Sequence, residues 1–145
     1  MKQENIMTLS FMSKSSNEAF ARAAVAAFIA QLDPTLEEIN DIKTAVSEAV
    51  TNAIVHGYGC PDGTVTVSCR LLAERSVEIA ISDTGRGIQD IEKARQPLYS
   101  DSEDLDRAGM GFTVMEAFMD DINIISSPGK GTTVQLYKKL QSHAV

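Results

Sequence analysis

The chain has few cysteines, no long apolar segment and no excess of basic residues, and each shortage excludes a class of protein. Its longest uninterrupted apolar run, Ala23–Ala30, has eight residues, whereas a membrane-spanning helix needs about 20. Its 2 cysteines form neither a disulfide framework nor a cluster of metal ligands. The formal net charge of -7 disfavours nucleic acid, whose phosphates attract Lys and Arg. We therefore expect no membrane span and no direct nucleic-acid contact, and we expect a protein partner.

The length of 145 residues and the hydrophobic content of 43% suit a single domain over residues 1–145. The first residues, Met1–Asn5, carry charges of both signs and lead into no signal-like apolar segment. We therefore expect the protein to stay in the cytoplasm.

Hydrophobic periodicity and turn residues divide the chain into strands and helices. Ser15 and Glu18 have the spacing of a capping box, which predicts a helix start. Asp33-Pro34 before two glutamates predicts a second start, because Pro and acids suit the first turn, and His56 is expected to cap that helix. Short turns between strands favour a largely antiparallel sheet with helices on one face, an α+β sandwich. The expected strands are 7–11, 65–71, 77–81, 122–126 and 132–138, and the expected helices are 15–32, 33–56 and 110–119.

Glu48 and Asn52 lie four residues apart in the second expected helix, so they share one face of it. If buried among its apolar residues, they need polar partners, and a metal ion with water would supply them. An Asn carbonyl oxygen suits Mg²⁺, which prefers one or two protein oxygens together with water and substrate phosphates. A Glu one turn earlier can take a proton from an attacking hydroxyl. The alternative is that both side chains face solvent.

Asp83 follows an apolar run, so it is expected at a strand end, where its carboxylate can accept a hydrogen bond from an exocyclic amine such as adenine N6. Gly85 and Gly87 allow positive φ and leave room for a flat ring. One alternative is a plain glycine turn. Another is an aspartic protease, because Asp83-Thr84-Gly85 matches the tripeptide of that class. Such an enzyme needs two of these Asp residues, so with one copy here it would have to be a homodimer.

Gly109 and Gly111 are expected to open the helix at 110–119. Unsatisfied N–H groups and the helix dipole make such a terminus an anion site, and phosphate fits there. Arg107, two residues earlier, can pair with a terminal phosphate. The alternative for Arg107 is a solvated charge.

Three segments of the chain resemble the boxes of a known superfamily. Glu48–Ala53 with His56-Gly57 resembles the N box of the GHKL ATPases and kinases, Asp83–Gly87 resembles their G1 box, and Gly109–Phe112 resembles their G2 box. The resemblance spans nearly the whole chain. Its small size, without a histidine-phosphotransfer or sensor domain, is similar to that of the anti-sigma serine kinases. The segments most similar to the sporulation anti-sigma-F factors of spore-forming bacteria are 17–22, 28–35 and 94–98.

The resemblance implies the Bergerat ATP-binding fold, a two-layer sandwich with a largely antiparallel, mixed sheet. It also implies a homodimer that holds a sigma factor away from core RNA polymerase or phosphorylates a serine on an anti-anti-sigma protein. ATP and Mg²⁺ are the implied cofactors.

The resemblance also assigns roles by motif. Glu48 would be the catalytic base, Asn52 the Mg²⁺ ligand and Asp83 the adenine anchor. A hydroxyl after Gly131 would support adenine recognition, and both Thr132 and Thr133 fit that position. The glycines would act as two pairs, with Gly85 and Gly87 shaping the pocket and Gly109 and Gly111 cradling phosphates.

Arg22 lies in an otherwise alanine-rich helix and is a candidate partner contact, because Arg is enriched at binding hot spots. A solvated helix charge is the alternative. The whole pattern leaves two main hypotheses, a protein-serine kinase that also sequesters a sigma factor and a non-catalytic sigma-binding module gated by ATP. The homodimeric aspartic protease is a third, which would leave Glu48 and Asn52 without a role.

Overall fold

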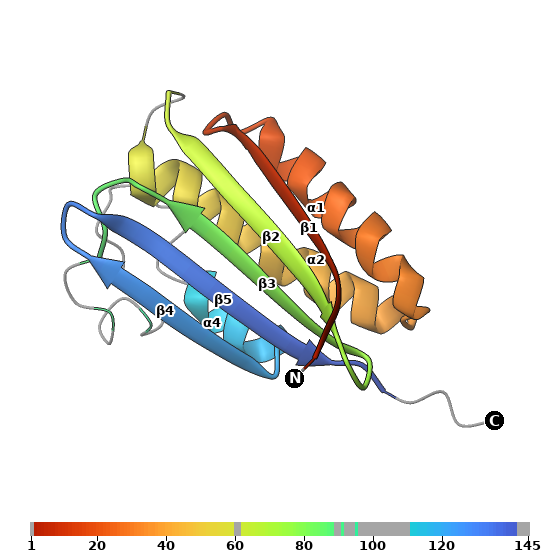
Figure 1. Cartoon of the computed structure of the whole chain (residues 1–145). Helices are drawn as coiled ribbons and strands as arrows, with labels where there is room; N and C mark the ends of the chain where they lie inside the picture. Colours follow the sequence, from red (N-terminus) through yellow and green to blue (C-terminus); the bar gives the residue numbers. More distant parts are fainter. Residues whose placement is uncertain (1, 60–61, 89–90, 92–94, 96–110, 142–145) are drawn as a thin grey trace.

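The structure, a computed structural model, describes residues 2–59, 62–88, 91, 95 and 111–141 (Figure 1). Arg107 and Gly109 therefore lie outside the described residues. Within the described part, none of the helices is both long and apolar enough to cross a membrane. The elements in chain order are β1 (Gln3–Met12), α1 (Asn17–Ile29), η1 (Ala30–Leu32), α2 (Leu36–Asn52), η2 (Ala53–Tyr58), β2 (Thr64–Leu72), β3 (Ser76–Asp83), α4 (Gly111–Phe118), β4 (Asp121–Ser127) and β5 (Gly131–Lys139).

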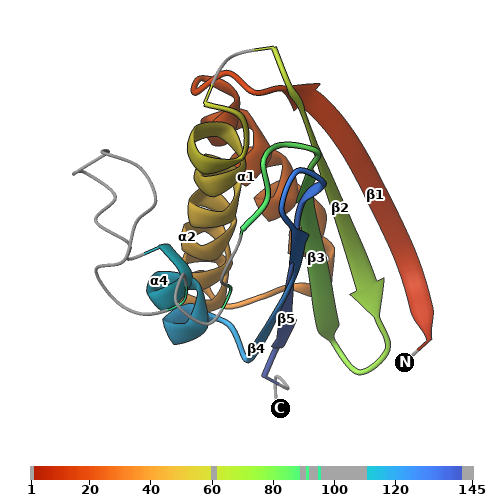
Figure 2. The same ribbon diagram turned by 90° about the vertical axis from the view of Figure 1, so that its left-hand side faces the viewer.

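The five described strands form one sheet in the order β1-β2-β3-β5-β4. All of the described pairings are antiparallel, so this part of the sheet is antiparallel throughout rather than mixed. Figure 2 shows α1, α2 and α4 together on one side of the sheet. The predicted α+β sandwich with helices on one face is confirmed.

Alternation along the strands decides which side chains face the helices. In β2 the buried residues include the alternating Val65, Val67, Cys69 and Leu71, and in β3 they include Ile79 and Ile81. Fully burying a side chain such as Val or Ile contributes about 1.5–3 kcal/mol. Asp83 ends β3 two residues after Ile81, so it continues this core-facing row as a carboxylate.

Cys69 belongs to the same core. Burial raises the pKa of its thiol to about 12, so it stays neutral and packs as a small apolar group. It is a free thiol, as expected, whereas Cys60 falls outside the described residues.

Two of the predicted helix ends are wrong. The first helix has Ser16 rather than Ser15 at its N-cap, without a side-chain capping bond, because the Asn17 and Glu18 N–H groups already donate to the Lys14 and Ser15 carbonyls. His56 does not end the second helix, which continues as the π-helix η2 to Tyr58 and stops at Gly59 with φ 66°.

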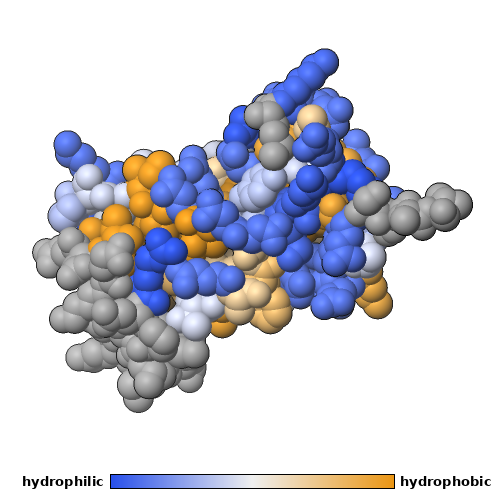
Figure 3. Space-filling model, turned by 90° about the horizontal axis from the view of Figure 1, so that it is seen from below, coloured by the Kyte–Doolittle hydropathy of each residue, from blue (hydrophilic) through white to orange (hydrophobic). Residues whose placement is uncertain are grey.

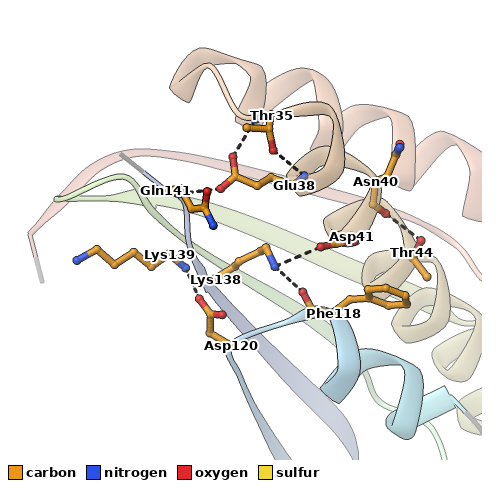
Figure 4. Close-up of polar contacts among 10 residues, drawn as sticks. All are labelled: Thr35, Glu38, Asn40, Asp41, Thr44, Phe118, Asp120, Lys138, Lys139 and Gln141. Atoms are coloured by element: carbon orange, nitrogen blue, oxygen red, sulfur yellow. Dashed lines mark hydrogen bonds and ion pairs between the residues drawn. The ribbon is translucent and has the colours of Figure 1, made fainter. Parts of the chain in front are cut away.

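The second helix start is confirmed, and it is also tied to the last strand. Thr35 is its N-cap, with a complete capping box to Glu38, and Pro34 lies just before the cap rather than in the first turn. The Glu38 carboxylate accepts the Thr35 N–H at 2.8 Å and the Gln141 N–H, beyond β5, at 2.7 Å (Figure 4). Glu38 therefore joins the start of α2 to the chain that follows β5.

Lys138 of β5 makes a second link between layers. Its Nζ donates to the Phe118 carbonyl at the end of α4 at 2.7 Å and faces Asp41 of α2 at 3.7 Å (Figure 4). One ammonium thus holds the end of α4 and the first turns of α2 to the sheet.

Replacing Glu38 with Gln is expected to lower the free energy of unfolding by about 1–3 kcal/mol, because one of the two N–H donors then meets an amide NH₂. Partial burial raises the pKa of Glu38, but hydrogen bonds from Thr35 and Gln141 and the charge of Arg75 bring the pKa below its ordinary value. A lowered pKa gives stability that is present above the unfolded pKa, about 4.3, and is lost as the pH falls through the folded pKa.

Urea unfolding at pH 7 and at several pH values below 5 measures both effects. The exposed neighbour Glu37, changed to Gln, is the matched control and should cost about 0.5 kcal/mol or less. Equal losses for the two variants, or a difference that does not shrink at acid pH, would contradict the role of Glu38.

Candidate functional site

The ends of several elements meet at one edge of the sheet. At that edge β3 ends at Asp83, β5 begins at Gly131 and β4 ends at Ser127, and the end of η2 packs against β3. In Figure 1 these ends lie together on the left-hand side of the molecule. This edge carries most of the described residues that the sequence marks as candidates.

Asn52 and Gly111 come together although they are far apart in the chain. A Cβ built on Gly111 would lie 3.0 Å from Asn52 Nδ2 and 3.1 Å from Asn52 Oδ1. The first residue of α4 therefore rests against the amide at the end of α2. Asn52 is partly exposed.

Asp83 is buried, with 9% of its surface exposed. Its Oδ1 accepts the Gly85 N–H at 2.9 Å. Burial raises the pKa of Asp83, and backbone hydrogen bonds to Gly85 and Thr132 lower it by less, so the pKa stays above its ordinary value. The carboxyl therefore loses its charge at a higher pH than a solvent-exposed Asp would.

The loop after β3 makes close backbone contacts on both sides. A Cβ on Gly85 would lie 2.0 Å from the Gly57 carbonyl oxygen, and one on Gly87, at φ 75°, would lie 2.1 Å from the Ser127 carbonyl oxygen. The Arg86 N–H donates to the Gly57 carbonyl, and the Gly129 N–H donates to the Arg86 carbonyl. Side chains at either glycine would push this loop away from Asp83.

Thr132 and Thr133 lie on opposite faces of β5. Thr132 pairs with Asp83 and Thr133 pairs with Ser82, so Thr132 shares the helix-facing side with Asp83. Thr132 Oγ1 bonds to Ser126 Oγ at 2.8 Å, whereas Thr133 Oγ1 bonds to Ser82 Oγ at 3.0 Å on the open face. Only Thr132 is placed beside the Asp83 carboxyl.

Glu48 and Arg22 line a groove of about 350 Å³ between α1 and α2. The Arg22 side chain is 40% exposed, and its Nε lies 3.6 Å from Glu18 Oε2. The other residues that line the groove are all polar or charged: Asn40, Lys43, Thr44 and Ser47. The structure thus brings the candidate base and the candidate partner contact to one surface.

Three residues of this edge were not predicted as site residues. Gly57 was expected directly after the helix end at His56, and Gly131, at φ 89°, directly before the last strand, without a role of its own for either; yet a Cβ on either would press on Asp83. Ser126 Oγ bonds to the Ile88 N–H and the Gly131 carbonyl as well as to Thr132. A serine in an ordinary strand pattern carries no sequence signal for that role.

Metal binding here would rely on few protein ligands. In the described ranges, no three His, Cys, Asp or Glu side chains gather into a metal site. Mg²⁺ often binds through one or two protein oxygens and takes its other ligands from phosphates and water. The carboxamide of Asn52, beside the start of α4, fits that kind of site.

The face seen in Figure 3 is largely hydrophilic, with hydrophobic surface gathered beside the residues drawn in grey. The exposed large apolar side chains of the described residues include Phe20 and Leu36.

Comparisons with known proteins agree with the fold. Residues 12–138 match the histidine kinase-like ATPase domain family. The chain is 57% identical to the anti-sigma F factor of Clostridium acetobutylicum over 136 residues, 94% of each chain. It is 52% identical to that of Clostridium perfringens strain SM101 over 139 residues, 96% of this chain and 99% of the relative.

Solved structures support the fold alone. The RsbU and RsbW domains of a Mycobacterium tuberculosis protein superpose with a TM-score of 0.69 at 23% identity, over 94% of this chain and 32% of the other. The catalytic domain of the histidine kinase ThkA gives 0.59 at 11% identity, over 94% and 97%. The chain therefore belongs to the histidine kinase-like ATPase family, in the branch of the anti-sigma F factors.

Proposed function

We propose that the chain is an anti-sigma factor that holds a sporulation sigma factor away from core RNA polymerase and uses ATP to phosphorylate a serine of an anti-anti-sigma protein. The relatives at 52–57% identity carry the name anti-sigma F factor. The observation that carries the proposal is the meeting of three distant segments, since Asn52 contacts Gly111 and η2 contacts Asp83. We further propose that residues 1–145 form a single ATP-binding domain that works in the cytoplasm as a homodimer.

The proposed site takes ATP along the edge where β3 and β5 meet the end of α2. Asp83 would accept a hydrogen bond from adenine N6, in a pocket shaped by Gly85 and Gly87. The start of α4 at Gly111 would bind phosphate through backbone N–H groups. Gly109 and Arg107 keep the phosphate-binding roles that the resemblance implies.

Glu48 is proposed as the base for the phosphoryl transfer. The serine hydroxyl attacks the γ-phosphorus, its proton passes to Glu48, the bond to the bridging oxygen breaks and ADP leaves. Asn52 would hold Mg²⁺, which supplies positive charge to the phosphate oxygens. Since positioning and electrostatics provide most of the catalysis in such reactions, few side chains need to react.

The groove beside Glu48 is the proposed approach for the protein partner. Arg22 lies in that groove and is partly exposed, and a serine must come close to Glu48 to lose its proton. We therefore propose Arg22 as a contact for the sigma factor or the anti-anti-sigma protein.

Phosphotransfer to the protein substrate is the direct test. The purified chain is incubated with γ-labelled ATP, Mg²⁺ and an anti-anti-sigma protein, with and without its acceptor serine changed to Ala. Label on the serine protein alone is the expected result. No transfer of label to the serine protein, together with ATP-dependent binding of the sigma factor in a parallel binding assay, would contradict the kinase and favour the non-catalytic module. An aspartic protease does not fit this chain, because the chain belongs to a family of ATPases.

Replacing Thr132 with Val is expected to weaken ATP binding about 2- to 10-fold, the effect of losing one net hydrogen bond. Thr133→Val should change the affinity less than twofold, because its hydroxyl lies on the open face with Ser82. Calorimetry with ATP and Mg²⁺ measures both variants. The assignment of Thr132 is wrong if Thr133→Val has the larger effect.

A further inference from the structure

Gly57 lies directly against the carboxyl group of Asp83. A Cβ built on Gly57 would be 2.8 Å from Asp83 Cγ and 2.9 Å from each carboxylate oxygen. Real Cβ atoms essentially never approach so closely. The absence of a side chain at Gly57 therefore leaves the space that the carboxyl group occupies.

The π-helix η2 brings Gly57 to this position. It spans Ala53–Tyr58, directly after Asn52, and π-turns of this kind occur frequently at functional sites. Two hydrogen bonds hold the backbone of η2 to the loop after β3. The Gly57 carbonyl accepts the Arg86 N–H at 2.9 Å, and the His56 carbonyl accepts a hydrogen bond from Arg86 Nε. Gly57 cannot move away from Asp83 without breaking these contacts.

The Asp83 carboxyl is equally restricted. Asp83 is 9% exposed, and its Oδ1 accepts a hydrogen bond from the Gly85 N–H. On the β5 side, the backbone of Gly131 lies directly against the backbone carbonyl oxygen of Asp83. A group added at Gly57 would therefore have to turn the carboxyl group or displace η2.

We propose that Gly57 is a positioning residue that fixes the Asp83 carboxyl where it selects the purine base of the nucleotide. This inference depends on the proposed function. If the Asp83 carboxylate is turned away, it loses its hydrogen bond to the 6-amino group of adenine. The contacts to the ribose, the phosphates and Mg²⁺ lie elsewhere in the site. Gly57 thus acts on base selectivity rather than on nucleotide binding in general.

The backbone conformation of Gly57 allows its contact with Asp83 to be tested without introducing backbone strain. Among the glycines that the structure describes, those of positive φ are Gly59, Gly87, Gly129 and Gly131. Gly57 is not one of them, so alanine can adopt its backbone. In a helical segment, Gly to Ala ordinarily raises stability. A loss of ATP affinity in Gly57→Ala therefore points to the contact with Asp83 and not to backbone strain.

The test compares ATP with inosine triphosphate (ITP), which carries oxygen in place of the 6-amino group. Calorimetry with Mg²⁺ is run on the wild type, Gly57→Ala, Asp83→Ala and the double variant. In Gly57→Ala we expect ATP affinity to fall about tenfold or more and ITP affinity to stay within about twofold. In the Asp83→Ala background, adding Gly57→Ala should cost no further ATP affinity, because the carboxyl group that it would strike is gone.

Unchanged ATP affinity in Gly57→Ala would overturn the proposal, as would equal losses for ATP and ITP or equal losses in both backgrounds. If Gly57→Ala does not fold, the double variant must fold, because it lacks the carboxyl group that the added Cβ would strike. An unfolded double variant would also overturn the proposal. A wild type that binds no ATP would refute the proposed function itself. A wild type that binds ATP and a Gly57→Ala variant that matches it would refute this inference alone.

Discussion

Glu48→Gln is expected to slow phosphotransfer to the serine protein by about 100- to 10,000-fold, the usual contribution of a general base, and to leave ATP affinity within about twofold. Gln has nearly the same size as Glu and cannot take the serine proton. Glu48 lines the groove between α1 and α2, and the nucleotide contacts proposed above come from other residues, so binding and chemistry should separate.

Single-turnover labelling with saturating ATP, together with calorimetry, measures the two quantities. Glu37→Gln is the matched control, because it removes an exposed carboxylate from the same helix and should transfer phosphate at the wild-type rate. Equal rates for the wild type and Glu48→Gln would remove the base from the mechanism. A parallel loss of ATP binding would instead make Glu48 a ligand-binding residue.

Asp83→Ala is expected to weaken ATP binding by about 10- to 150-fold, because a hydrogen bond to a charged acceptor contributes about 1.5–3 kcal/mol. Ser82→Ala is the control, since Ser82 lies next to it in the strand and faces the other side of the sheet with Thr133. Ser82→Ala should bind ATP normally. An equal loss of ATP affinity in both variants would show that any disturbance of β3 weakens binding and would contradict the direct contact of Asp83 with adenine.

The pH dependence of binding provides a second measure of Asp83. Because burial raises its pKa, the carboxyl becomes neutral at a higher pH than an exposed Asp, whose pKa is about 3.9. ATP affinity of the wild type should therefore begin to fall while the pH is still above that value. Asp83→Ala should lack this component of the pH profile.

Most of the fold follows from local patterns in the sequence. The strand β2 alternates buried Val65, Val67, Cys69 and Leu71 with less buried residues, which is the period that predicts a strand facing a core. The start of α2 was predicted from Asp33-Pro34 and the two glutamates that follow, and the structure adds a complete capping box between Thr35 and Glu38.

The same spacing failed at Ser15 and Glu18. There the backbone carbonyls of the preceding turn already accept the first N–H groups, so no donor is left for a serine side chain. A capping box in the sequence indicates a helix start only when the chain before it does not form such a turn.

The site was harder to predict because it depends on distances between remote segments. Motif spacing identified Asn52, Asp83 and Gly111 separately, but their contacts depend on how α2, α4 and β3 pack. The π-helix η2 has no sequence period that distinguishes it from the end of an α-helix, so the helix was expected to end at His56 and Gly57 was given no role of its own. The choice between Thr132 and Thr133 needed the register of β5 against β3.

Calorimetric titration of the wild-type chain with ATP in the presence of Mg²⁺ tests the central claim most directly. If the segments around Asn52, Asp83 and Gly111 form one nucleotide site, the titration will show saturable heat with one ATP bound per chain, and omitting Mg²⁺ will weaken binding. No heat of binding at millimolar ATP with Mg²⁺ would contradict the account.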